Sequence, residues 1–99
     1  MLLLSIGIAL HGIHRVDPDK LDNLISLNLP MGTDKAMVIA FLDTHHIVHT
    51  DYIPEHMMIQ AGIDRSSVGL VHARIHIDFL FDEKGKLVRH KLVELFEFL

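Results

Sequence analysis

The chain has 99 residues, of which 49% are hydrophobic and 22% charged, with a net charge of −4 when histidine is neutral. It is therefore long enough for one domain with a modest core and too apolar for a disordered chain. The acidic balance and the lack of any Lys/Arg cluster argue against nucleic acid as a partner. The absence of cysteine excludes disulfides, thiolate catalysis and the commonest structural zinc sites.

Residues 1–16 start with the apolar run MLLLSIGIAL, which ends at His11 and Gly12. A membrane-spanning helix needs about 20 apolar residues, and a signal peptide has a basic region before its apolar run; this run satisfies neither condition. We expect a buried strand or a helix start here. The alternative is the remnant of an export or anchor segment, through which residues 1–10 would tether the chain to a membrane. That alternative favours the cell envelope over the cytoplasm. Residues 17–99 are expected to form a single domain.

Two helices are predicted next. The first runs from Pro18 to Leu27, because Asp17 can cap it and proline suits the first helical position. The second has Thr33 as its cap and ends near Thr44. Its buried face is predicted from apolar residues at helical spacing, namely Met37, Val38, Phe41 and Leu42.

The pattern then changes from helical to alternating. HIVHTDYI is rich in β-branched and aromatic residues and predicts a strand over His46–Ile53, which stops at Pro54. MMIQAGI, residues 57–63, predicts a second strand, and DRSSVG predicts a turn after it. LVHARIHIDFLF is the strongest strand signal, because apolar residues at 71, 73, 75, 77, 79 and 81 alternate with polar ones and form a core face.

DEKGK predicts a hairpin loop in which the glycine adopts the left-handed conformation, and KLVRHKLVELFEFL predicts the fourth strand. Pairing Phe81 with Leu87 sets the register of this hairpin. Arg89 and Lys91 would then lie on the core face, which predicts either a bulge near His90 or a position beyond the cover of the helices. The register predicts three cross-strand pairs: Arg74 with Glu94, Asp78 with His90, and Ile75 with Val93.

Two amphipathic helices followed by four antiparallel strands predict an α+β fold. A meander sheet with one apolar face needs a cover, and the two N-terminal helices packed on that face supply it. We therefore expect a two-layer α+β sandwich.

Four histidines lie in DTHHIVHTDYIPEH, residues 43–56, and raise the question of a metal site. In a strand, His46 would point away from His49, while His49 and Asp51 would share one face. The sequence also lacks the HExxH pattern of helical zinc sites. We expect no metal site and no cofactor. The alternative is a module that binds a divalent metal through His46, His49, Asp51 and His56.

A second polar cluster is expected on the solvent face of the sheet, formed by Arg74, His76, Asp78, His90 and Glu94. An aspartate beside a histidine resembles a base and its orienting group, but no Ser or Cys nucleophile is placed with them. We therefore interpret the cluster as cross-strand pairs and as a candidate protein-binding surface. A small enzyme using His76 and His90 is the remaining alternative.

The segments GTDKAMVIAFL, Gly32 to Leu42, and FDEKGKLV, Phe81 to Val88, resemble parts of the small β-lactamase-inhibitor-like domains, in which two helices also precede an antiparallel meander. The arrangement is similar as well to small outer-membrane assembly lipoproteins and to uncharacterised small bacterial proteins with a short H-I-x-H strand and a closing FDExGKL hairpin. This resemblance implies a non-enzymatic domain that acts by protein contact, often in the cell envelope. The chain departs from these families because it has no lipobox cysteine and no matching aromatic loop residues of an inhibitor.

The sequence therefore predicts a non-catalytic protein-interaction or structural module. Its partner would be another protein, bound on the polar sheet face or at an exposed edge strand. Phe96, Phe98 and Leu99 make the end of the chain apolar, so a homodimer that covers them is a further expectation. The alternative is that these residues lie under the first apolar segment.

Overall fold

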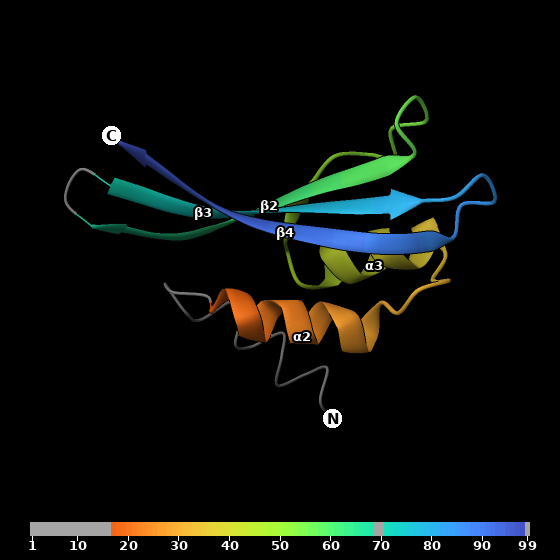
Figure 1. Ribbon diagram of the computed structural model, residues 1–99, viewed down its shortest axis with the longest axis horizontal. Coiled ribbons are helices and arrows are strands. Elements are labelled where there is room, and N and C mark those ends of the chain that lie inside the picture. The colour runs from red at the N-terminus through yellow and green to blue at the C-terminus, as the bar shows by residue number, and fades with distance from the viewer. Residues whose placement is uncertain (1–16, 69–70, 99) are drawn as a thin grey trace.

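A computed structural model describes residues 17–68 and 71–98, so the expectations for residues 1–16 and for Leu99 lie outside the described residues. The helices and strands are, in chain order, α2 (Pro18–Asn28), α3 (Lys35–Thr44), β1 (Val48–His49), β2 (Met58–Val68), β3 (Val71–Phe81) and β4 (Leu87–Phe98) (Figure 1). The strands form an antiparallel sheet in the order β1-β2-β3-β4. The predicted α+β fold, with two N-terminal helices before a four-stranded antiparallel meander, is confirmed.

Helix α2 follows its sequence signals closely. The Asp17 carboxylate accepts a hydrogen bond from the Asp19 N–H at 2.9 Å, and Pro18 lies in the first turn, where its missing N–H costs no hydrogen bond. The helix ends at Asn28, one residue beyond the predicted Leu27. Local signals alone are therefore enough to define this element.

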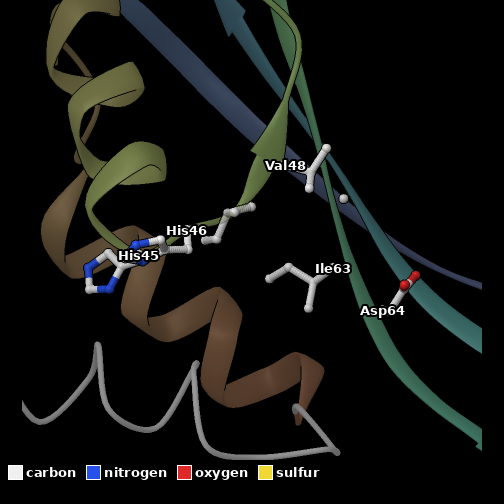
Figure 2. A pocket seen from close by; sticks show the side chains of 7 residues that line it. His45, His46, Val48, Ile63 and Asp64 are labelled. Atoms are coloured by element: carbon white, nitrogen blue, oxygen red, sulfur yellow. The ribbon is translucent and has the colours of Figure 1, made fainter.

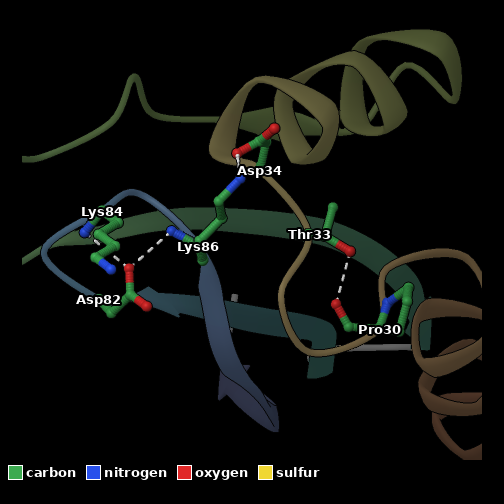
Figure 3. A network of polar contacts seen from close by, with 6 residues as sticks. All are labelled: Pro30, Thr33, Asp34, Asp82, Lys84 and Lys86. Carbon is green, nitrogen blue, oxygen red and sulfur yellow. Dashed lines mark hydrogen bonds and ion pairs between the residues drawn. The ribbon is translucent and has the colours of Figure 1, made fainter.

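The start of α3 is capped differently from the prediction. Asp34, and not Thr33, is the N-cap residue, and its side chain makes no capping hydrogen bond. Instead, the first amide of α3, that of Lys35, donates to the Gly85 carbonyl of the β3–β4 hairpin at 3.0 Å. The Thr33 hydroxyl donates to the Pro30 carbonyl at 2.6 Å (Figure 3). A tertiary contact thus satisfies an amide that a local cap would otherwise serve.

The β3–β4 hairpin forms as predicted, with Gly85 in the left-handed region at a φ of 75°. An Asp82 carboxylate oxygen accepts hydrogen bonds from the backbone N–H groups of Lys86 (3.0 Å) and Lys84 (2.8 Å), and these lower the pKa of Asp82 from its ordinary value. The Lys86 ammonium lies 2.6 Å from an Asp34 carboxylate oxygen (Figure 3). The hairpin loop is therefore tied to the start of α3.

The segment after α3 departs from the predicted strand His46–Ile53. Helix α3 ends in a Schellman motif, in which the Ile47 N–H donates to the Leu42 carbonyl (2.9 Å) and the His46 N–H to the Asp43 carbonyl (3.1 Å). This motif holds His46 at a φ of 56°, a left-handed conformation in which glycine is more usual. Strand pairing is confined to β1 and to one bridge at the end of the segment, so the prediction of a continuous strand is wrong.

Strand β2 is longer than predicted. The sequence placed a turn directly after residue 63, but β2 continues to Val68, and Asp64–Val68 pair with β3. A bulge between Asp64 and Ser66 interrupts this pairing. The turn-prone residues Ser66 and Ser67 are thus held in the strand by pairing with Ala73 and His72 of β3.

The core lies on one face of the sheet, under the two helices (Figure 1). The alternation predicted for β3 is confirmed, since residues 73, 75, 77, 79 and 81 are all buried. Met37 was expected on the buried face of α3 but is 60% exposed. The largest fully buried side chains are Phe79, Leu21, Ile25, Leu42, Ile59, Ile75, Ile77 and Val38.

The register between β3 and β4 confirms the Phe81–Leu87 pair but shifts directly after it, where Leu80 pairs with Arg89. The extra residue is Val88, slightly before the position at which the sequence suggested a bulge. The three cross-strand pairs predicted beyond it are therefore wrong. Arg74 lies opposite Leu95, Asp78 opposite Lys91, and Ile75 opposite Glu94.

The one-residue shift exchanges the two faces of β4. Arg89 and Lys91 turn to the face without helices, whereas His90 and Leu92 turn to the face that the helices cover. The physical reason is the cost of burying two cations without partners, which the unshifted register would have required.

Candidate functional site on the uncovered face and free edge of the sheet

The Val88 bulge divides the polar cluster that was predicted on the solvent face. Arg74, His76 and Asp78 do lie together on the uncovered face of β3, where they are exposed or half-buried. His90 and Glu94 lie on the opposite, helix-covered face, opposite Phe79 and Ile75. The five residues therefore do not form one surface.

His90 instead links the sheet to a helix. Its Nε2 atom lies 2.6 Å from an Asp22 carboxylate oxygen of α2, and its side chain is only 14% exposed. Its ring also lies 6.3 Å, centroid to centroid, from the ring of Phe79. This side chain fixes α2 beneath β4 (Figure 1) and is a structural residue of the covered face.

The charged groups on the uncovered face are paired with one another. The His76 Nε2 atom lies 3.1 Å from an Asp78 oxygen, and the Arg74 guanidinium lies 3.6 Å from Asp64 and 3.9 Å from Glu97. The Asp78 oxygen that meets His76 is buried, whereas the Arg74 pairs are exposed and contribute about 0–1 kcal/mol each. Because they are weakly held, these groups are suited to polar contact with another surface.

His49 is held by two hydrogen-bond acceptors. Its Nδ1 atom lies 2.6 Å from the Thr50 carbonyl, and its Nε2 atom lies 2.7 Å from an Asp43 carboxylate oxygen. Burial alone would lower the pKa of His49, but the hydrogen bonds to Asp43 and Thr50 and the charges of Asp43 and Asp51 together raise it above the ordinary 6.5. Only the protonated ring can donate to both acceptors at once.

The other three residues of the alternative metal site lie in three different segments of the chain. His46 follows the end of α3, Asp51 follows β1, and His56 lies in the turn before β2. In the described part of the chain, no three His, Asp or Glu side chains are grouped so that they could hold a metal ion. The structure thus gathers His49 with Asp43, which the sequence had not singled out, because a helix end and a short strand meet there.

Two open hollows flank β1, and the sequence predicted neither. One of about 340 Å³ lies on the uncovered face beside Arg74 and His76. Gly62 borders both hollows. Because it has no side chain, the surface of the sheet is depressed between its cross-strand neighbours Val48 and His76. The other, of about 420 Å³, is lined by His45, His46, Ile47, Val48, Gly62, Ile63 and Asp64 (Figure 2).

Strand β4 is an edge strand among the described residues, with β3 as its neighbour on one side. The Phe81 N–H donates to the Met57 carbonyl, so the backbone N–H and C=O groups of Phe81 point toward β2. Because these groups alternate in direction along a strand, those of Leu80, Asp78, His76 and Arg74 point toward β4. Their partners on β4 are Arg89, Lys91, Val93 and Leu95. The residues between these partners therefore direct their N–H and C=O groups away from β3, toward the edge of the sheet.

The two halves of β4 differ in how this edge is protected. The first half carries the Val88 bulge and the cations Arg89 and Lys91, which discourage pairing with any strand that does not offer matching anions. The loop before α3 also covers its start, because the Gly32 N–H donates to the Leu87 carbonyl at 2.7 Å. The second half instead exposes apolar side chains, with Val93 37%, Leu95 43% and Phe96 64% exposed.

Comparisons of the chain with protein-family models, with curated proteins and with solved structures gave no match. The resemblance to β-lactamase-inhibitor-like and outer-membrane assembly domains therefore remains a prediction from short motifs. Among the described residues, neither helix is long and apolar enough to cross a membrane.

Proposed function

We propose that the chain is a non-catalytic protein-binding module that acts by strand addition at the edge formed by β4. A partner strand would pair with the backbone groups that β4 directs away from β3. Its side chains would also cover Val93, Leu95 and Phe96. In keeping with the resemblance described above, we propose that this binding takes place in the bacterial cell envelope.

The contrast within β4 carries this proposal. Edge strands of natural proteins are usually protected by charges, bulges or covering loops, and in β4 the bulge, the covering loop and the cations all lie at or before Lys91, whereas Glu94 and Glu97 are the charges of the second half. Beyond Lys91 the strand combines outward backbone groups with apolar side chains on both of its faces. An exposed apolar segment of this kind supports binding of another chain.

Proline substitution at Phe96 tests the proposal. The Phe96 N–H points away from β3, so Phe96→Pro removes an edge donor without removing a hydrogen bond inside the sheet. Phe96→Ala is the matched control, because it removes the same ring and keeps the N–H. Tagged wild type and both variants are used to capture proteins from the native host, and thermal unfolding verifies that each variant is folded.

We expect a specific partner to be captured by wild type, to be captured in lower yield by Phe96→Ala, and to be lost with Phe96→Pro. The alanine variant should bind more weakly because one apolar contact is missing. A partner that both folded variants capture as well as wild type would show that β4 is not the binding edge.

A further inference from the structure

We infer that the strand added to β4 is β4 of a second copy of the chain, antiparallel to the first and related to it by a two-fold axis at Val93. This inference rests on the proposed function and names its partner. Such a contact is isologous, because the same residues of both copies form it, and the two sheets become one continuous sheet.

The distribution of charge along β4 favours this partner. The first half of the strand carries the cations Arg89 and Lys91, and the second half carries the anions Glu94 and Glu97. An antiparallel copy therefore sets the cationic half of each strand against the anionic half of the other. A parallel copy would set like charges beside one another, which is destabilising.

The faces of β4 and its charges limit where the two-fold axis can pass. Directly opposed residues lie on the same face of a sheet, so the axis must pass through a residue and not between two residues. An axis at Glu94 would set this carboxylate directly opposite its own copy. An axis at Leu92 would set the Arg89 guanidinium against the apolar Leu95.

An axis at Val93 avoids both conflicts. It sets Val93 opposite its own copy on the uncovered face, and it sets Arg89 of each chain opposite Glu97 of the other. Glu97 is accessible for this contact, since its side chain is 57% exposed and lies a long 3.9 Å from the Arg74 guanidinium. Two ion pairs and one apolar contact are thus formed by a single choice of register.

The same register covers the exposed apolar side chains of the second half of β4. Leu95 comes to lie opposite Lys91 of the copy, whose methylene chain can pack on it while its ammonium stays in water. Phe96 comes to lie opposite His90 of the copy on the other face, which forms a cross-strand aromatic pair. The side chains that are 43% and 64% exposed in one chain would therefore be covered in the dimer.

Charge reversal tests both the partner and the register. The whole chain is examined by sedimentation over a range of concentrations, as wild type, as Arg89→Glu, as Glu97→Arg and as a mixture of the two variants. Each variant alone should dimerise about tenfold more weakly than wild type, because both ion pairs become like-charge contacts. The mixture should restore dimerisation, because every such contact in the mixed dimer joins a glutamate to an arginine.

Two further variants serve as controls. Lys91→Gln keeps part of the methylene chain that packs on Leu95 of the copy and removes an ammonium that meets no anion there, so it should weaken dimerisation far less than Arg89→Glu, by about twofold. A much larger loss would favour a register in which Lys91, and not Arg89, meets Glu97. Lys84→Gln removes an exposed cation of the hairpin loop, outside the paired segment of β4, and should leave dimerisation unchanged. Thermal unfolding of each variant separates weakened pairing from weakened folding.

The outcomes distinguish this inference from the proposed function. A wild-type chain that stays monomeric at every concentration, or a mixture that does not restore dimerisation, overturns the inference. If a different host protein is then captured by wild type and lost with Phe96→Pro, strand addition at β4 stands and only the second copy is refuted. If no proline-sensitive partner of either kind is found, both proposals fail.

Discussion

The two ends of the sheet are held in different ways. At the hairpin end, formed by residues 81–87, the backbone of the loop before α3 bonds directly to β4. The Gly32 N–H donates to the Leu87 carbonyl, and the Leu87 N–H donates to the Thr33 carbonyl, both at 2.7 Å. The Lys86–Asp34 ion pair of 2.6 Å closes the same end from outside.

The distal end is formed by residues 64–68, 71–74 and 95–98, where three strands extend past the helices (Figure 1). The side-chain ion pairs described there are longer, with His72 at 3.2 Å and Arg74 at 3.6 Å from an Asp64 side chain that is 70% exposed. One end of the sheet is thus completed by the loop before α3, whereas at the other end the described residues leave the outer edge of β4 without a neighbouring strand.

Two phenylalanines test the comparison most strongly. Phe79 is fully buried in the core, whereas Phe96 at the distal end is 64% exposed. Phe79→Ala leaves a cavity and should lower the free energy of unfolding by about 3–5 kcal/mol. Phe96→Ala should change it by no more than about 0.5 kcal/mol. Chemical denaturation at a concentration where the chain is monomeric measures both, and equal losses would mean that the distal end is packed like the core.

Two glycines test the hairpin end more narrowly. Gly85 has a φ of 75°, which an L side chain rarely adopts, so Gly85→Ala should cost about 1–2 kcal/mol of unfolding free energy. Gly62→Ala is the control, because this glycine does not have a positive φ and a Cβ there would meet only the Ile75 carbonyl oxygen at 3.9 Å. It should be neutral or stabilising by less than about 1 kcal/mol. The midpoints of urea unfolding should show a larger loss of stability for Gly85→Ala than for Gly62→Ala. The opposite order would contradict this prediction.

The parts of the fold that could be predicted from sequence are those determined by local chemistry. Asp17 and Pro18 define the start of α2, Gly85 defines the hairpin, and alternation defines β3, because each signal acts within a few residues. The capping of α3 was mispredicted because the amide of Lys35 is satisfied by a hairpin far along the chain. A prediction based on neighbouring residues cannot detect a hydrogen bond between segments that lie so far apart in the sequence.

The candidate site was predicted less well, because a single extra residue decides it. The bulge at Val88 moves His90 and Glu94 to the covered face and brings Arg89 and Lys91 to the uncovered one. The awkward burial of two cations signalled a bulge, but its position depends on how β4 meets the loop before α3. The end of α3 near Thr44 was predicted correctly, but the Schellman motif that follows it has a histidine, His46, where glycine is the usual signal, so the residues after the helix were assigned to a strand.

The contact between Asp22 and His90 tests where the covered part of the sheet ends. This contact joins α2 to β4 through side chains, with 2.6 Å between the His90 Nε2 atom and an Asp22 carboxylate oxygen, and it is partly buried. Asp22→Ala should lower the free energy of unfolding by about 1 kcal/mol. Asp19→Ala removes a carboxylate from the first turn of the same helix and should cost no more than about 0.5 kcal/mol. Denaturant titration of the two variants compares them, and an equal loss would mean that His90 does not anchor the helix.

The smallest expected effect depends on pH and concerns His49, whose pKa is raised above 6.5 in the folded chain. A raised folded pKa means that the protonated ring contributes stability fully below about pH 6.5, and that this contribution is lost as the pH rises through the folded value. Asp43→Asn removes the hydrogen-bonding carboxylate at 2.7 Å that favours the protonated ring. The drop in melting temperature relative to wild type should therefore be larger near about pH 5.5 than near about pH 8.5.

Asp51→Asn is the control for this pH effect, because Asp51 acts on His49 only through its charge and should give a weaker dependence of the same sign. Comparing each variant with wild type at the same pH cancels the titration of the other histidines. If Asp43→Asn lowered the melting temperature equally at both pH values, the contact would be a neutral hydrogen bond. The junction of α3 with β1 would then owe no stability to the charge of His49.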